Sequence, residues 1–131
     1  MMLNPVAFVA AAPAATHNWQ SHRDERRAAD PHRALQRALL GWFADQPCRI
    51  TVAMTLARPW ASATFTGIRH AFDLTLSGDR HRATATAFEA ALDAIDWTIA
   101  GHFVADIAIV RTQSDAMETV LTVEALSVAG D

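Results

Sequence analysis

The stretch Ile68-Arg69-His70-Ala71-Phe72-Asp73-Leu74-Thr75-Leu76 alternates between two kinds of residue. Every second residue is apolar, with His70 as the exception, and most residues between them are polar. Successive side chains of a β-strand point to opposite faces, so this period of two predicts a strand with one face in a core. Ser77-Gly78-Asp79 follows as a turn. The buried face of such a strand needs a covering layer, which the neighbouring segments must supply.

Three further segments show the same period and are predicted to be strands. The first follows Cys48 and places Ile50, Val52, Met54 and Leu56 on one face. We expect Arg58-Pro59 to end it, and residues 60–67 to form a loop or an irregular strand edge. The other two strands cover residues 99–109 and 119–125, on either side of a polar turn at residues 112–116.

Two segments have the spacing of amphipathic helices. Asp30-Pro31 is a strong helix start, because Asp is a good N-cap and Pro suits the first helical position. The apolar residues that follow at three-to-four spacing are Ala34, Leu35, Ala38, Leu39 and Trp42, and Pro47 ends this helix. The apolar stripe of the second helix consists of Ala85, Phe88, Ala91, Leu92 and Ile95.

The order α-β-β-α-β-β predicts an α+β fold. We expect a two-layer sandwich in which an antiparallel four-stranded sheet carries both helices on one face. A last hairpin centred near Ser114 would place Ile107 opposite Leu121, Ala105 opposite Val123 and Val104 opposite Glu124. The predicted organisation is an N-terminal arm at 1–29, partly helical or loose, a single domain at 30–128 and a tail end at 129–131.

Length and composition limit the classes of protein. The chain has 131 residues, of which 51% are hydrophobic and 19% charged, as in a single globular domain. Its net charge of −3 gives no global basic field for nucleic acid or anionic membrane. A single cysteine excludes an internal disulfide framework and a multi-thiolate metal site. No stretch reaches the roughly 20 apolar residues of a membrane span, so no membrane partner is expected.

The N-terminal segment leaves two interpretations open. Residues 1–16 are small and apolar, and no Lys or Arg precedes their core, which argues against a signal peptide. They are a loose arm or an arm that covers a neighbouring subunit. Residues 17–37 hold five arginines diluted by acidic residues. This pattern favours a solvated helix face over a basic patch for phosphate.

The sheet face away from the helices is more apolar than a solvated face should be. We therefore predict that it is an oligomer interface, although the N-terminal arm is a second candidate to cover it. The residues assigned to this face are Val104, Ala108, Val110, Val120, Leu126 and Val128.

The search for chemistry finds no catalytic, cofactor-binding or metal site. We interpret His70 as a hydrogen-bonded core histidine. His102, Asp106 and Glu124 share the outer face in the predicted register, but the first two lie about 13 Å apart along a strand and cannot hold one ion. Cys48 has no base that sequence can place beside it. We expect no enzyme, no metal and no cofactor.

Arg80-His81-Arg82 opens the second helix, where cations oppose the helix macrodipole. These three residues are a solvated turn or a contact to an acidic partner surface.

Four segments together resemble a known family. They are residues 34–39 (ALQRAL), 67–76 (GIRHAFDLTL), 99–104 (IAGHFV) and 121–126 (LTVEAL). In this order they resemble the tail-completion, or tail-terminator, proteins of tailed phages and of phage-derived gene transfer agents. The resemblance covers about residues 34–128, and its motifs are structural rather than catalytic.

The resemblance implies a structural protein of virion assembly. Such proteins form a ring, usually a hexamer, that caps the tail tube and joins it to the head connector. The implied partners are further copies of the chain, tail-tube proteins and head-completion proteins, with DNA only as passing cargo. The implied location is the cytoplasm or an assembled phage-like particle. The alternative is a homodimeric ligand-binding or regulatory module without catalysis, with a pocket near His70, Met54 and Phe72.

Overall fold

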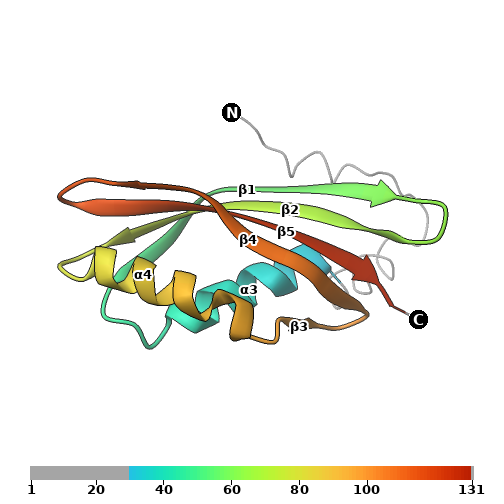
Figure 1. Ribbon diagram of the computed structural model, residues 1–131, viewed down its shortest axis with the longest axis horizontal. Helices are drawn as coiled ribbons and strands as arrows, with labels where there is room; N and C mark the ends of the chain where they lie inside the picture. The colour runs from blue at the N-terminus through green and yellow to red at the C-terminus, as the bar shows by residue number, and fades with distance from the viewer. Residues whose placement is uncertain (1–29, 131) are drawn as a thin grey trace, which may run out of the picture.

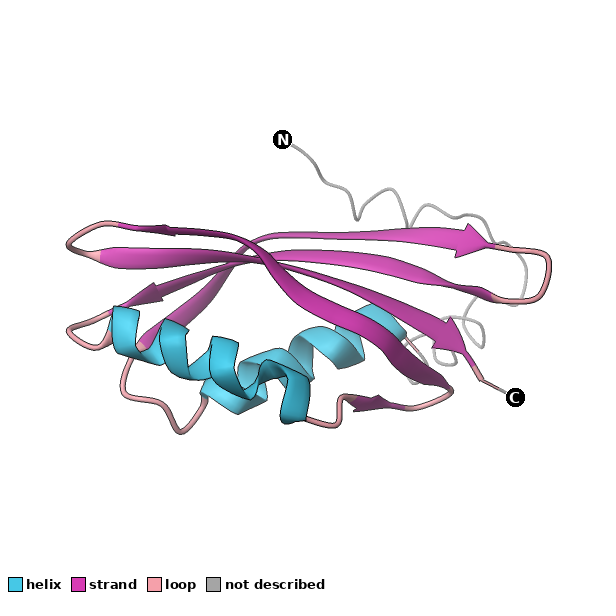
Figure 2. Ribbon diagram, in the orientation of Figure 1, coloured by secondary structure: helices cyan, strands magenta, loops and turns pink. Residues whose placement is uncertain are grey.

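A single antiparallel sheet carries two helices on one face (Figures 1 and 2). The computed structural model describes residues 30–130, so the predicted arm at 1–29 and the terminal Asp131 lie outside the described residues. The sheet order is β1-β2-β5-β4-β3. The α+β sandwich of four long strands and two helices is thus confirmed, with a two-residue fifth strand added at one edge. The elements are α3 (Pro31–Phe43), β1 (Arg49–Ala61), β2 (Thr66–Ser77), α4 (His81–Ala91), the 3-10 turn η1 (Leu92–Ala94), β3 (Thr98–Ile99), β4 (His102–Ser114) and β5 (Glu118–Ala129).

The first helix begins where the sequence predicts. The Asp30 side chain accepts hydrogen bonds from the backbone N–H groups of His32, at 3.0 Å, and Arg33, at 3.2 Å. Pro31 occupies the first helical turn, where a missing N–H costs nothing. This cap fixes the start of α3 and therefore the position of His32 over the sheet.

Replacing Asp30 with alanine is expected to lower the free energy of unfolding by about 1 kcal/mol, because two helical N–H groups lose their acceptor. Urea unfolding followed by circular dichroism measures the change. Asp30→Ser is the matched control and should retain most of the stability, since a serine hydroxyl also caps helices. Equal losses in the two variants would contradict a capping role.

The core lies between the helices and the inner sheet face. Leu35, Leu39 and Phe43 of α3 are buried, and the Phe43 ring packs 4.8 Å, centroid to centroid, from the Phe88 ring of α4. Each fully buried side chain of this size contributes about 2 kcal/mol of hydrophobic free energy. The sheet residues beneath them are Phe72, Leu74 and Leu76 of β2 and Leu121, Val123 and Ala125 of β5.

A β-bulge at Ala53 changes the face of the first strand. Val52 pairs with Leu74 on the core side, but Met54 pairs with the adjacent Asp73. Met54 is therefore 39% exposed on the outer face instead of buried beside Val52. The unbroken inward alternation expected for β1 is wrong, because the extra residue reverses every side chain after it.

The first strand also continues past the proline expected to end it. Pro59 pairs with Ile68, and β1 runs on to Ala61. Ser62 closes the hairpin by donating its N–H to the carbonyl of Phe65 at 2.8 Å. A proline is tolerated here because β1 is an edge strand, where one side of the ladder has no partner among residues 30–130.

Two bulges in β4 overturn the predicted register of the last hairpin. Register shifts lie between Val104 and Asp106 and between Ile109 and Arg111. The hairpin turn is centred near Ala116 rather than Ser114, with the Asp115 N–H bonded to the Glu118 carbonyl at 2.9 Å. The three predicted pairs are wrong. Ile107 pairs with Ala125 and Val104 with Ser127, whereas Ala105 is unpaired at a bulge. Their predicted partners Leu121, Val123 and Glu124 pair with Thr112, Ile109 and Ala108.

Candidate functional site

The outer face of the sheet is the surface opposite the two helices. Five of the six predicted interface residues lie on it. The register places Ala108, Val120, Leu126 and Val128 there, and Val110, which is unpaired at a bulge, lines the hollow on the same face. The sixth assignment is wrong. Val104 pairs with the buried Ser127 and packs against the core cluster, because the bulge at Ala105 reverses the face of the strand before it.

A shallow hollow of about 380 Å³ crosses this outer face. Its apolar floor comes from all four long strands, and its charges are divided between the two sides. Arg58 and Arg69 lie on β1 and β2, whereas Asp106 and Glu124 lie on β4 and β5. The residues that line it are Leu56, Arg58, Arg69, His70, Ala71, Asp106, Ala108, Val110, Glu124, Ala125 and Leu126.

Both edges of the sheet are open within residues 30–130. On one side the 13-residue strand β1 has no partner along the edge that faces away from β2. On the other side β3 pairs with β4 only at His102 and Phe103. The rest of β4, from Val104 to Ser114, pairs with no further strand among residues 30–130. The segment 92–97 lies beside residues 104–107 of this edge. Free edges of this length are templates for pairing with another chain.

A pair of histidines joins the start of α3 to the inner sheet face. The His32 Nδ1 atom lies 2.9 Å from the His70 Nδ1 atom, and the two rings are parallel to within 2°. Beyond this contact, His32 Nε2 is hydrogen bonded to the Thr55 hydroxyl, and His70 Nε2 lies 2.8 Å from the Ser127 hydroxyl. The four side chains form one continuous hydrogen-bonded row from β1 through α3 and β2 to β5.

This row admits two neutral arrangements. Only one proton fits between the facing Nδ1 atoms, so one ring donates and the other accepts. If His32 donates, then Thr55 donates to His32 and His70 donates to Ser127. If His70 donates, His32 donates to Thr55 and Ser127 donates to His70. Every ring nitrogen is satisfied in either case.

Burial keeps the pair neutral near pH 7. The pKa of His70 is lowered to about 3, first by burial and then by the neighbouring His32 and His102. Burial also lowers the pKa of His32, and the Asp30 carboxylate opposes this shift only in part. The interpretation of His70 as a hydrogen-bonded core histidine agrees with this geometry.

His32 is a partner of His70 that is not among the predicted site residues. A signal was present, because His32 precedes Leu35 and Leu39 at the spacing of the buried stripe of α3. The pocket proposed near His70, Met54 and Phe72 is not formed, since Met54 lies on the opposite sheet face. Phe72 instead stacks on His32, with centroids 4.8 Å apart.

The Arg80-His81-Arg82 segment is bound largely within the chain. His81 is buried, with Nδ1 2.8 Å from the Thr119 hydroxyl and Nε2 3.3 Å from the Ala116 carbonyl. Arg82 donates to the Asp115 carbonyl at 2.9 Å. The prediction that His81 contacts a partner is therefore wrong, because His81 is buried and its hydrogen bonds join α4 to the β4–β5 hairpin. Arg80 is exposed at the N-cap of α4.

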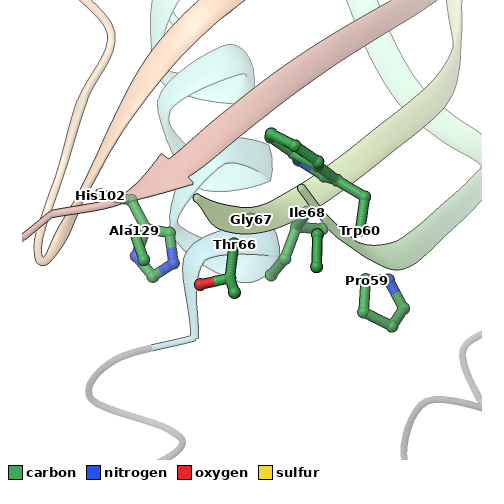
Figure 3. A pocket seen from close by; sticks show the side chains of 8 residues that line it. Pro59, Trp60, Thr66, Gly67, Ile68, His102 and Ala129 are labelled. Carbon is green, nitrogen blue, oxygen red and sulfur yellow. The ribbon is translucent and has the colours of Figure 1, made fainter. Parts of the chain in front are cut away.

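A second hollow, of about 430 Å³, lies where the β1–β2 hairpin meets the ends of β4 and β5 (Figure 3). Trp60 lies on one side of the strands, and Thr66, Ile68 and His102 lie on the other (Figure 3). The Trp60 Nε1 and His102 Nδ1 atoms are buried without a hydrogen-bond partner in the described part of the chain. Trp60 and His102 lie on opposite faces of the sheet at this hollow. Their unpaired nitrogen atoms therefore do not converge on one point (Figure 3).

The polar residues considered for metal chemistry are dispersed. Asp106 pairs with Leu126 and Glu124 with Ala108, whereas His102 pairs with Ala129 and lies close enough to His70 to lower its pKa. The predicted placement of all three on one outer face is therefore wrong for His102. Within residues 30–130 no group of three His, Cys, Asp or Glu side chains is arranged to hold a metal ion. Cys48 is half-buried before β1.

No helix among the described residues is both long and apolar enough to cross a membrane.

Comparisons of the chain with protein-family models, with curated proteins and with solved structures found no match.

Proposed function

We propose that this chain is a structural subunit that assembles head to tail into a ring of the tail-terminator kind. The observation that carries the proposal is the pair of free sheet edges, β1 on one side and β4 on the other. A subunit with two different free edges can bind the next copy through a heterologous contact, and such contacts form a ring when the rotation from copy to copy closes.

The directions of the strands favour this contact. All three pairings among the four long strands are antiparallel, so β1 and β4 run in opposite directions. When β4 of one copy lies beside β1 of the next in the same orientation, the new pair is again antiparallel. The sheet can therefore continue from copy to copy with its pattern unchanged.

The positions of the family-like segments and the charge of the chain also support the proposal. Residues 67–76 and 121–126 belong to the two central strands, and residues 34–39 belong to the helix that covers them. Gly101, with φ of 78°, makes the turn that starts β4 in the segment 99–104. A net charge of −3 suits a ring whose opening passes DNA, because like charges prevent adhesion.

Cysteines on opposite edges test the head-to-tail contact. In a Cys48→Ser background, Thr51→Cys on β1 is combined with Val110→Cys, Arg111→Cys or Gln113→Cys on β4. At least one pair is expected to give a ladder of disulfide-linked species on mild oxidation, ending at the size of the ring. Each single variant is the control and should give no more than dimers. Dimers from Thr51→Cys alone, without a ladder from any pair, would mean that β1 meets a second β1.

The tail role is tested with the full chain and the tail-tube protein of the same particle. Light scattering after size exclusion is expected to give a ring mass, alone or after the tube protein is added. Electron microscopy should then show rings at tube ends. A monomer under both conditions would overturn the ring, whereas rings that leave the tube ends bare would overturn only the tail role.

A further inference from the structure

We propose that the outer face of the sheet binds a second copy of this chain, face to face, about a two-fold axis parallel to the strands. The charged side chains of that face are distributed so that the face is complementary to itself. This contact differs from the edge contact, which pairs the backbones of β1 and β4. Both helices lie on the opposite face and leave the outer face unobstructed by α3 and α4 (Figure 2).

The register arranges the outer face in rows that cross all four long strands. Each row is given in the order β1, β2, β5, β4. The three rows at the centre and at the end near the β1–β2 hairpin are Trp60-Gly67-Val128-Phe103, Arg58-Arg69-Leu126-Asp106 and Leu56-Ala71-Glu124-Ala108.

A two-fold axis parallel to the strands reverses the order of each row. Arg58 then faces Asp106 of the second copy, and Asp106 faces the second copy's Arg58. Arg69 lies over Leu126, where its aliphatic stem can pack. Glu124 lies over Ala71, so no like charges meet in these rows. The face is thus complementary to itself, as an isologous contact requires.

The other aligned arrangement is less favourable. A two-fold axis at right angles to the strands, through the row that contains Glu124, places each residue of that row on its own counterpart. The two Glu124 carboxylates would then meet in the middle of the contact. Opposed like charges that lose water are costly, so this arrangement is disfavoured.

Exposed apolar side chains supply the driving force. Phe103 is 53% exposed and Val110 52% exposed on this face. In the proposed arrangement Phe103 faces Trp60 of the second copy, and Val110 comes close to Met54. Two sheets packed about 10 Å apart remove these side chains from water, as in a β-sandwich. The charged pairs then fix orientation more than affinity.

Charge reversal tests the pairing. Arg58→Glu and Asp106→Arg are each expected to raise the dimer dissociation constant at least tenfold in sedimentation equilibrium. The double variant should return it to within about threefold of the original value, because the pair is re-formed with the charges exchanged. Arg80→Glu, on the helix side, makes the same charge change as Arg58→Glu and should leave the constant unchanged.

Two results would overturn this inference. One is a full-length chain that stays monomeric at every accessible concentration. The other is self-association that ignores both single reversals or is not rescued by the double variant. The cysteine ladder separates the two contacts, because a face-to-face pair closes at two copies, whereas the head-to-tail edge contact links more than two. If no cysteine pair gives a ladder of disulfide-linked species while the double charge variant still restores the dimer dissociation constant, the ring proposal fails and the face-to-face contact stands.

Discussion

Replacing Gly67 with alanine is expected to lower the free energy of unfolding by about 3 kcal/mol. A Cβ atom at this position would lie 2.0 Å from the carbonyl oxygen of Ser127 and 2.6 Å from Trp60 Nε1. The first contact is with the backbone of β5, which pairs with β2, so it cannot be relieved by a side-chain rotation. Strand β5 and the indole must both move. Chemical denaturation of the purified variant measures the loss.

Gly41 provides the matched control for this substitution. It lies in α3, and a Cβ atom there would meet nothing within 4 Å. Gly41→Ala should therefore stabilise the chain by about 0.5 kcal/mol, because alanine is the better helix former. Similar destabilisation by the two substitutions would contradict the close approach of β5 and Trp60 to Gly67.

Acidification from pH 7 to pH 5 is expected to lower the free energy of unfolding by about 2 kcal/mol through His70 alone. The pKa of His70 is about 3 in the folded chain against 6.5 in the unfolded chain. Between pH 6.5 and about pH 3 the imidazole of His70 is protonated in the unfolded chain and neutral in the folded chain. The free energy of unfolding therefore falls as the pH falls. His32 acts in the same direction, because its pKa is also lowered. The loss begins near pH 6.5.

Urea midpoints at pH 7, 6 and 5 measure this effect. His70→Gln keeps a polar side chain but cannot titrate, so its stability should change less over this range. The Asp115 carboxyl does not interfere, because the backbone N–H groups of Met117 and Glu118 lower its pKa from the usual range, so its contribution is lost only at more acidic pH. The same pH dependence in the original chain and in His70→Gln would show that the acid sensitivity arises elsewhere.

The features that sequence predicts well are those encoded by neighbouring residues. Asp30 and Pro31 determine a helix start together, without help from the rest of the chain. The alternation from His70 to Leu76 places its even residues in the core without interruption, because β2 contains no bulge. The fold class follows from such local signals, since the order of helices and strands leaves one simple two-layer arrangement.

The errors arise where an extra residue interrupts a strand. Ala53, Ala105 and Val110 carry no sequence signal that separates a bulged residue from a paired one. The face assigned to Met54 and Val104 therefore depends on pairing that only the assembled sheet determines. The same holds for the histidine pair, because His32 and His70 are 38 residues apart and meet through the packing of α3 on the sheet.

The bulges also bear on how the length of this chain can vary in evolution. A deletion at most positions of a strand would exchange inner and outer side chains beyond it. A deletion of Ala53, Ala105 or Val110 would instead leave a regular ladder, because each is the unpaired residue of its strand. Single-residue length differences between this protein and its descendants can accumulate at these three points in β1 and β4 while the core keeps its residues. Of the three, only the loss of Val110 removes an apolar side chain from the outer-face hollow.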